Sequence, residues 1–360
     1  MAALGGTGGT GGTGGTGGTG GTGGTGGTGG SGTLMDGWAN PLVASALLSS
    51  RDGIMDRDKH KSFVKGNGAP PALNGAKELI RWDPWVRVNL GVTEMTGRVA
   101  YKPNGSDSFV AVLREGNKDL VELKRPDLPF FVAQLKHVQS WAELRDERAL
   151  EVLAQIDNQY AFIAAVTGLN VSRMPWTIEW LTIGIQFTVA VEMVFKHALG
   201  CFRPVHLSPQ VQPIITTPGH GTYPMGHAAQ AFVTIVALRG LLGLAETHET
   251  YQQLYRQARR ISVNRTVAGT HFPIDAAAGQ VLGLSLGELF VRASGLSKPD
   301  CFDRKFVPAG SGDATVNDYL GDGTVGPAEG CTTGTTALTV TPSDFLKELV
   351  RLAKPEWSLT

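Results

Sequence analysis

The pattern of apolar and polar positions changes character near residue 129. Before it, alternating or β-rich apolar residues in Val86–Val92 and Phe109–Leu113 predict short strands. From about Pro129 to Gly168, apolar residues recur at helical spacing instead. The positions that carry this spacing are Val132, Leu135, Val138, Leu150, Leu153, Ile156, Tyr160 and Ile163. The chain is therefore expected to pass from an irregular or β-containing part into a helical one.

Start and stop residues predict further helices beyond Gly168. Pro175 suits the first turn of a helix, and Gly200 followed by Pro204 suits its end. The stretch from Ser297 to Pro342 is rich in Gly, Thr, Pro and Asp and is expected to be loop. The other predicted helices are His227–Leu244, Thr247–Thr266, Ile274–Ala293 and a short amphipathic one at Ser343–Ala353. We expect a mainly α protein, a helical bundle with a small irregular or β-containing N-terminal part.

Four parts of the chain follow from this pattern. Residues 1–33 are built from Gly-Gly-Thr repeats, whose side chains bury too little apolar area to offset the entropy of ordering, so a disordered tail is predicted. An irregular or β-containing segment is expected over 34–128, the helical bundle over 129–295, and a loop-rich C-terminal tail with its short helix over 296–360.

Composition excludes some functions and favours a compartment. Lys+Arg and Asp+Glu both number 32, so a neutral chain is not expected to bind nucleic acid, and any useful positive charge must be local. The apolar stretches Trp180–Leu199 and Ala228–Ala245 contain charged or amide side chains, which favours buried helices and no membrane span.

The first residues, Met1–Leu4, lack the features of a secretory signal, which favours the cytoplasm. Whether Cys301 and Cys331 pair is left open.

Two cations lie in an apolar helical stretch. Lys196 and Arg203 are seven positions apart, almost two helical turns, so both are expected on one face. Burying such cations without a partner is costly, and an anion should lie opposite them. A buried ion pair with Glu192 or Glu179 would explain the same two residues without any ligand.

Two further segments add candidate chemistry. Gly226 lies at a helix start, where its backbone N–H and its small size suit an anion, and His227 beside it suits general acid or base catalysis or a helix cap. In the second segment, Arg265 adds a third cation. Asp275 lies close enough to His271 to accept a hydrogen bond from one ring nitrogen, which leaves the other as a nucleophile or a metal ligand. A purely structural His–Asp pair would leave the same pattern.

The order and spacing of these residues resemble a known superfamily. Lys-x6-Arg-Pro, then Pro-x-Gly-His, then Arg-x5-His-x3-Asp over Lys196–Asp275 is similar to the motif that joins type 2 phosphatidic acid phosphatases, bacterial acid phosphatases and vanadium haloperoxidases. The resemblance implies a helical bundle. It also implies an oxyanion site in which phosphate or vanadate oxygens are held by Lys196, Arg203, Arg265 and the N–H of Gly226, with His271 bonded to phosphorus or vanadium and His227 on the opposite side.

The sequence departs from that pattern at two positions. Family members usually have serine where Met225 and Asn264 stand. Met225 removes a hydroxyl donor to the bound oxyanion, a loss of about 1.5–3 kcal/mol, so weaker vanadate binding is expected. If the Met225 side chain points into the core, that effect is smaller.

One further residue favours the haloperoxidase branch. His220 precedes His227 by seven positions, in a loop that resembles the stretch where a histidine accompanies bromide oxidation in haloperoxidases. The resemblance then implies a vanadate-dependent enzyme, with His227, His271, Lys196 and His220 as its catalytic residues, Asp275 and Met225 behind them, and vanadate as cofactor. It would oxidise bromide or iodide with hydrogen peroxide to hypohalous acid, halogenate a small organic acceptor, and form a homodimer.

Two alternatives stay open on the same residues. An acid phosphatase would use His271 to form a phosphohistidine and His227 to protonate the leaving alcohol. A non-catalytic relative would bind phosphate and do nothing more.

Overall fold

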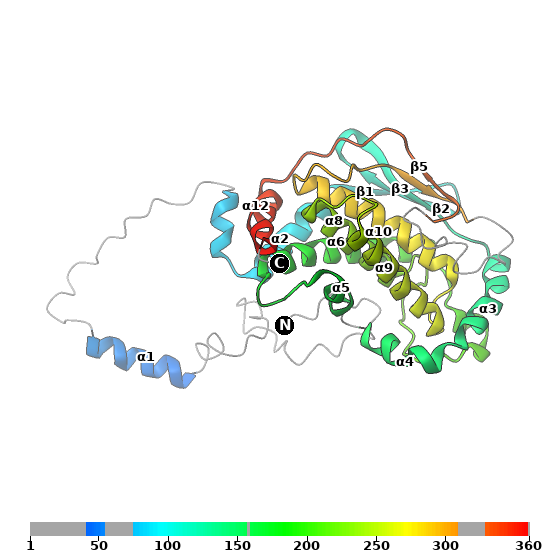
Figure 1. Cartoon of the computed structure of the whole chain (residues 1–360), viewed down its shortest axis with the longest axis horizontal. Coiled ribbons are helices and arrows are strands. Elements are labelled where there is room, and N and C mark those ends of the chain that lie inside the picture. Colours follow the sequence, from blue (N-terminus) through cyan, green and yellow to red (C-terminus); the bar gives the residue numbers. More distant parts are fainter. Residues whose placement is uncertain (1–40, 55–74, 157–158, 309–327, 359–360) are drawn as a thin grey trace. The chain divides into compact units, whose positions relative to one another are not determined.

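The structure, a computed structural model, describes residues 41–54, 75–156, 159–308 and 328–358 (Figure 1). Two compact units divide between Arg87 and Val88. The described part of the first holds α1 (Pro41–Ile54), the 3-10 helix Ala76–Arg81 and the start of α2 (Pro84–Gly97). The tail predicted over 1–33 lies outside the described residues.

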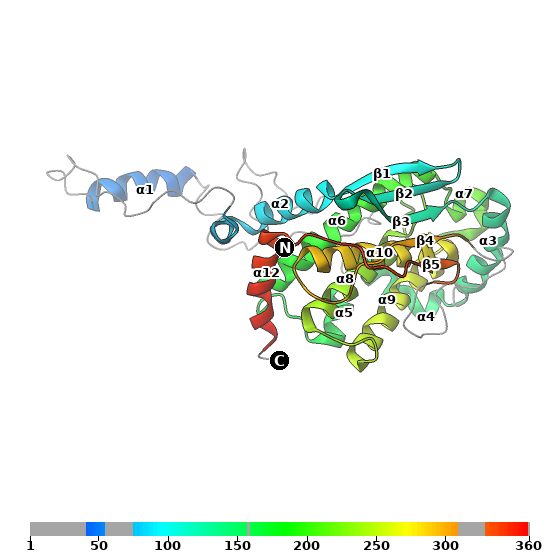
Figure 2. The same cartoon turned by 90° about the horizontal axis from the view of Figure 1, so that it is seen from above.

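The second unit is mainly helical, as the sequence predicts (Figures 1 and 2). Its helices are α3 (Leu128–Ala142), α4 (Arg145–Ala154), α5 (Tyr160–Thr167), α6 (Pro175–Leu199), α7 (Pro204–Leu207), α8 (Gly226–Leu242), α9 (Glu249–Val267), α10 (Pro273–Ala293) and α12 (Asp344–Ala353), with 3-10 turns at Glu115–Asn117, Pro209–Val211 and Lys354–Trp357. The mainly α class is confirmed. The stretch with helical spacing before Gly168 forms three helices, α3 to α5.

A five-stranded sheet lies along one side of α8 and α10 in both views (Figures 1 and 2). Its strands are β1 (Val99–Asn104), β2 (Ser108–Leu113), β3 (Lys118–Lys124), β4 (Arg304–Phe306) and β5 (Cys331–Thr333), in that order. β3 and β4 pair in parallel, and the other neighbours are antiparallel. The strand predicted at Phe109–Leu113 is confirmed as β2. The expectation of loop throughout 297–342 is wrong, because β4 and β5 complete the sheet. Cys301 and Cys331 are both free thiols.

The strand predicted at Val86–Val92 is wrong, because this stretch lies in α2. The buried positions of α2 are Arg87, Gly91 and Met95, which recur every four residues as a helix requires. Neither Arg87 nor Gly91 has an apolar side chain, so the buried face was not visible in the sequence. The apolar residues at every second position suggested the two-residue period of a strand instead. Gly91 is needed here because a Cβ would lie 2.6 Å from the side chain of Ile183.

The closest helix pair, α8 and α10, positions much of the site. Gly279, Gly283 and Gly287 form a stripe on α10 at four-residue spacing. A Cβ at Gly279 would lie 2.4 Å from the carbonyl oxygen of Met225, and one at Gly283 would lie 2.5 Å from that of Ala229. The stripe therefore lets the two backbones touch, and it brings the N-terminus of α8 beside that of α10.

The sheet also anchors the loop that precedes α8. The hydroxyl of Tyr223 donates to the carbonyl of Lys124 at the end of β3, at 2.8 Å. Arg125 donates to the carbonyl of Leu199 at 3.1 Å, which ties the same strand end to the end of α6. The loop and the helix end that carry the candidate site thus share one support.

Candidate active site

Lys196 and Arg203 come from different elements. α6 ends at Leu199, and Gly200 takes the left-handed conformation (φ 56°) that commonly closes a helix. Lys196 lies in the last turn of α6, whereas Arg203 is the N-cap residue of α7. The expectation that both project from one face of one helix is therefore wrong. Both side chains are nevertheless buried, with 2% and 1% of their surface exposed.

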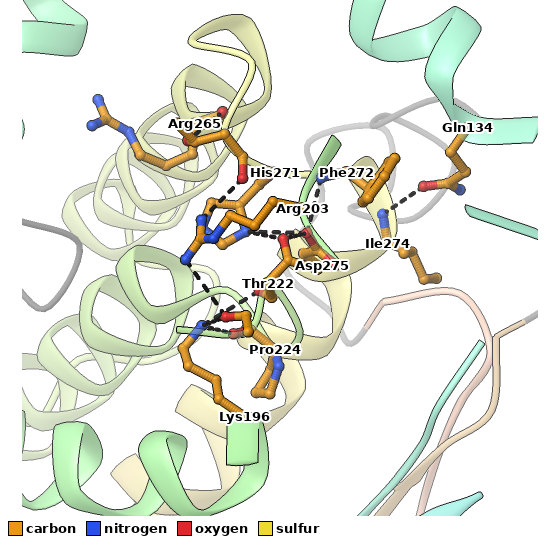
Figure 3. Close-up of polar contacts among 12 residues, drawn as sticks. Gln134, Lys196, Arg203, Thr222, Pro224, Arg265, His271, Phe272, Ile274 and Asp275 are labelled. Carbon is orange, nitrogen blue, oxygen red and sulfur yellow. Dashed lines mark hydrogen bonds and ion pairs between the residues drawn. The ribbon is translucent and has the colours of Figure 1, made fainter. Parts of the chain in front are cut away.

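The ammonium of Lys196 holds the loop before α8. Its Nζ donates to the carbonyls of Gly221 at 3.3 Å, Thr222 at 3.4 Å and Pro224 (Figure 3). Burial lowers the pKa of Lys196 to about 8, against the opposing effect of the Glu192 carboxylate one turn earlier. Lys196 therefore contributes positive charge to the site and fixes the path of the loop.

Arg203 joins three segments through its guanidinium. Nε donates to the carbonyl of His220 at 3.1 Å, and Nη1 donates to the carbonyl of Thr270 and to Nε2 of His271, both at 3.0 Å (Figure 3). Nη2 lies 3.1 Å from Nδ1 of His220. Burial lowers the pKa of Arg203 to about 10. Arg203 thus brings His220 and His271 to the same cation.

His271 is held from both sides of its ring (Figure 3). Since Arg203 can only donate, Nε2 accepts, and the proton of the neutral imidazole lies on Nδ1. Nδ1 lies 3.1 Å from Oδ2 of Asp275 and 3.1 Å from Oγ1 of Thr222. The Thr222 hydroxyl donates to the same Asp275 oxygen at 2.5 Å, and the N–H of Phe272 donates to it at 2.9 Å. Burial, with the charge of Arg203, lowers the pKa of His271 well below its usual range.

Asp275 keeps an unusual proton affinity for a carboxyl group. Burial raises its pKa to about 6, and the Thr222 hydroxyl and the Phe272 N–H work in the opposite direction. The hydrogen-bond geometry expected for His271 and Asp275 is thus present, with Thr222 as a third member.

His227 and Arg265 both contact the end of α4. Nε2 of His227 donates to the carbonyl of Gln155 at 3.0 Å, so the lone pair of the neutral ring lies on Nδ1. Nη2 of Arg265 donates to the carbonyl of Val152 at 2.8 Å and to Oε1 of Gln155 at 3.3 Å. The sequence motif places Arg265 and His271 around one anion, but the Arg265 guanidinium points away from His271 (Figure 3). The acceptors on α4 account for that direction.

The guanidinium of Arg265 nevertheless keeps N–H groups that no atom of the described residues accepts from. Its side chain is 1% exposed, and burial lowers its pKa to about 10. Within the described part of the chain, its Nε and Nη1 atoms have no hydrogen-bond partner. Buried N–H groups of a cation are costly to leave unpaired, so they mark a place where an oxyanion would be stabilised.

Gly226 and Met225 lie at the start of α8 in unexpected surroundings. A Cβ at Gly226 would lie 2.5 Å from Oε1 of Glu192, so a carboxylate explains the need for glycine here. Met225 is fully buried in an apolar cluster with Ala228, Val263, Val267 and Ala276. Its side chain therefore lies in the core, which was the second of the two placements open from the sequence.

The surroundings of Met225 predict the effect of restoring the family's serine. Met225→Ser is expected to lower the free energy of unfolding by about 2–4 kcal/mol, because it leaves a cavity and buries a hydroxyl. Urea unfolding would measure this loss, with the volume-conserving Met225→Leu as control at under about 1.5 kcal/mol. Vanadate affinity should not rise. A tenfold gain in affinity would mean that residue 225 faces the anion.

His227 predicts a specific sensitivity to acid. Burial, with Arg265 nearby, lowers the pKa of His227 to about 3, whereas an imidazole in the unfolded chain titrates near 6.5. The unfolded state therefore takes up the proton first, so this stability is complete above pH 6.5 and is lost as the pH falls towards 3. From pH 6.5 to 4.5, His227 should cost about 2–3 kcal/mol of unfolding free energy.

Urea unfolding at these two pH values, compared between wild type and His227→Asn, isolates that contribution. The variant should lose less stability than wild type, while His197→Asn, at an exposed position of α6, should keep the wild-type difference. Equal losses in wild type and His227→Asn would contradict the assignment of a buried neutral ring.

Two residues of the site were missed from the sequence. Thr222 lies inside a motif-bearing segment but carries no motif position, and Gln155 follows α4 as its C-cap residue, far from the motif in sequence. Thr222 sits in a loop between two named histidines, and that position was a usable signal. No feature of the sequence marked Gln155, because a single glutamine at the end of a helix is common.

The second unit is thus a helical bundle that buries Lys196, Arg203, Arg265, two histidines and the Asp275 carboxyl. Residues 179–298 match the sequence model of the PAP2 superfamily. It is also similar to a solved structure, a transmembrane PAP2-type phosphatidylglycerolphosphate phosphatase from Bacillus subtilis. The identity is 16%, the TM-score is 0.27, and the match covers 45% of this chain and 94% of that one. No curated protein matches the chain.

The expectation of no membrane span needs correction. Two helical stretches, Pro175–Leu207 and Pro273–Ala293, are long and apolar enough to cross a membrane by length and composition, with mean hydropathies of 1.4 and 1.3. In the structure, 72% of the most apolar 18-residue segment of the first stretch is buried inside the protein, and 100% of that of the second. The compartment and the homodimer stay predictions.

Proposed function

We propose that this chain hydrolyses phosphomonoesters through a covalent phosphohistidine at His271. The observation that carries the proposal is the orientation of the His271 ring, with Nδ1 held by Asp275 and the lone pair of Nε2 facing Arg203. A nucleophile held in this way lies beside any oxyanion that Arg203 binds. The PAP2 superfamily domain, which contains all three residues, supports the same chemistry.

The proposed reaction has two balanced steps. In the first, Nε2 of His271 displaces its contact with Arg203 and attacks phosphorus, and the bond from phosphorus to the alcohol oxygen breaks as His227 protonates that oxygen. In the second, water gives a proton to His227 and attacks phosphorus, the N–P bond breaks, and phosphate leaves. Arg203 and the charge of Lys196 offset the negative charge on the phosphoryl oxygens in both steps.

The electrostatics of His227 suit the role of acid once substrate is present. The pKa of His227 is lowered to about 3 by burial and by the charges of Arg265 and Lys196. A bound phosphate dianion offsets both charges, and this raises the pKa of the imidazole. Substrate binding therefore favours the protonated His227 that the first step requires.

Hydrolysis of para-nitrophenyl phosphate by the purified chain tests the proposal. We expect turnover that orthovanadate inhibits, because bound vanadate resembles the phosphoryl group in the transition state of its transfer. Rapid mixing should show a burst of para-nitrophenol of up to one equivalent per chain if breakdown of the phosphohistidine is slower than its formation. Absence of turnover while phosphate still binds would point to a non-catalytic relative and overturn the proposal.

A vanadate-dependent haloperoxidase is the second candidate, favoured by the contact between His220 and Arg203. The unpaired N–H groups of Arg265 fit the oxygens of vanadate, which Arg203, Lys196 and the N–H of Gly226 would also hold. Vanadate, bound at His271, would supply the oxidation of bromide or iodide by hydrogen peroxide to hypohalous acid, for transfer to a small organic acceptor. Bromination of a phenolic dye by the vanadate-loaded chain, without phosphatase turnover, would favour this candidate over the first.

A further inference from the structure

The end of α4 meets two groups of the proposed site. Gln155 follows the helix as its C-cap residue and is fully buried. Its backbone carbonyl accepts from Nε2 of His227 at 3.0 Å, and its side-chain Oε1 accepts from Nη2 of Arg265 at 3.3 Å. The same Oε1 accepts from Nδ2 of Asn264 at 3.0 Å. One residue, outside the segment that matches the PAP2 superfamily, therefore contacts both the proposed acid and a proposed anion-binding cation.

The orientation of the Gln155 amide is determined by its own neighbours. Nε2 donates to Oε1 of Glu151 at 3.0 Å, and a carboxylate can only accept from it. Glu151 is in turn held by Arg260 at 2.7 Å. The amide oxygen is thus left facing Arg265 and Asn264, and the amide cannot flip without losing both sets of contacts.

The neutrality of Gln155 matters as much as its position. The carbonyl of Val152 and Oε1 of Gln155 occupy Nη2 of Arg265, while Nε and Nη1 keep N–H groups without a partner in the described chain. An amide oxygen anchors one end of the guanidinium and leaves its full charge available. A carboxylate at the same place would form a buried ion pair and neutralise Arg265 before any oxyanion arrived.

We infer that the side chain of Gln155 positions this site, because it anchors Arg265 without neutralising it, while the backbone carbonyl of the same residue holds His227. The inference rests on the proposed oxyanion chemistry, and it assigns α4 a part in that chemistry. It also explains why asparagine is accommodated at 264, where the superfamily usually has serine, because Asn264 reaches the same amide oxygen.

Two variants with matched controls test the inference. Gln155→Glu keeps the shape and an acceptor oxygen but adds charge, so it should weaken orthovanadate binding by about tenfold to a hundredfold. Gln155→Met keeps the length but removes the acceptor, so kcat for para-nitrophenyl phosphate should fall by about tenfold and vanadate binding should weaken several-fold. Gln253→Glu and Gln253→Met, on the exposed face of α9, should match wild type in both measurements. Calorimetric binding and thermal unfolding of each variant accompany the kinetics.

The outcomes separate this inference from the proposed function. Wild type that neither binds vanadate nor turns over substrate would overturn the function. Wild type that does both, beside folded Gln155 variants of unchanged Kd and kcat, would overturn the positioning role alone. Tighter vanadate binding by Gln155→Met would also overturn it, because α4 would then be holding Arg265 away from the anion. A lower Tm with unchanged Kd and kcat in the folded fraction would mean that Gln155 serves stability only.

Discussion

Replacement of His271 by alanine is expected to lower the turnover of para-nitrophenyl phosphate by about four orders of magnitude or more. The variant lacks the atom that is proposed to bond to phosphorus, and loss of a nucleophile from a cooperating group costs nearly all of the catalysis that the group provides. Asp275 and Thr222, which hold Nδ1 of His271, would have nothing left to orient. Steady-state kinetics and the burst of para-nitrophenol would both report the loss.

The matched control is His197→Ala. His197 lies beside Lys196 on α6 but is exposed, so its removal should leave turnover within about twofold of wild type. Retention of vanadium after a vanadate soak should also disappear in His271→Ala and persist in His197→Ala. If His271→Ala retained a tenth of wild-type turnover, another group would have to be the nucleophile.

The sequence predicted the polar groups of the site better than their arrangement. Spacing alone suggested a His271–Asp275 pair, and the structure shows that hydrogen bond. The same reasoning placed Arg203 wrongly. Helical spacing puts Lys196 and Arg203 on one face only if the helix is continuous, and α6 ends at Leu199, between them. Arg265 shows a second limit. Its guanidinium donates to acceptors at the end of α4, which no motif links to it.

The fold shows a similar division. Helices with start and stop residues, such as α6 and α10, were predicted to within a residue or two, because caps and prolines act locally. β4 and β5 were not predicted, since each has three residues and exists through pairing with the edge at β3. Strands this short carry no periodicity of their own. Their formation depends on contacts between residues far apart in sequence.

The two histidines share one design, which links the arrangement to the chemistry. In each ring, one nitrogen donates to a fixed acceptor, Asp275 for His271 and the carbonyl of Gln155 for His227. The other nitrogen carries the lone pair, which in His271 accepts from Arg203. Burial lowers both pKa values, so both rings are neutral before an anion arrives. Under the proposed function, the neutral His271 is already nucleophilic, and the charge of the bound anion would raise the pKa of His227 so that it can act as the acid.

Arg203→Lys is expected to lower kcat/KM for para-nitrophenyl phosphate by about a hundredfold to a thousandfold, although the charge is conserved. The guanidinium reaches Nε2 of His271, the carbonyl of Thr270 and two atoms of His220 at once. An ammonium donates from a single atom and cannot keep this geometry. The oxyanion would then be attracted by the same charge but no longer held beside the nucleophile, so kcat should fall together with vanadate affinity.

Arg256→Lys, an exposed change of the same chemistry on α9, should leave both quantities unchanged and serves as the control. The comparison separates charge from geometry. If Arg203 contributes only its charge, Arg203→Lys should have kinetics close to wild type. If the fixed donors of the guanidinium position the oxyanion, the variant should show the large loss of kcat/KM. Near-wild-type kcat/KM in a folded Arg203→Lys variant would therefore remove Arg203 from contact with the transferred group, and with it the reason for placing the phosphoryl group beside Nε2 of His271.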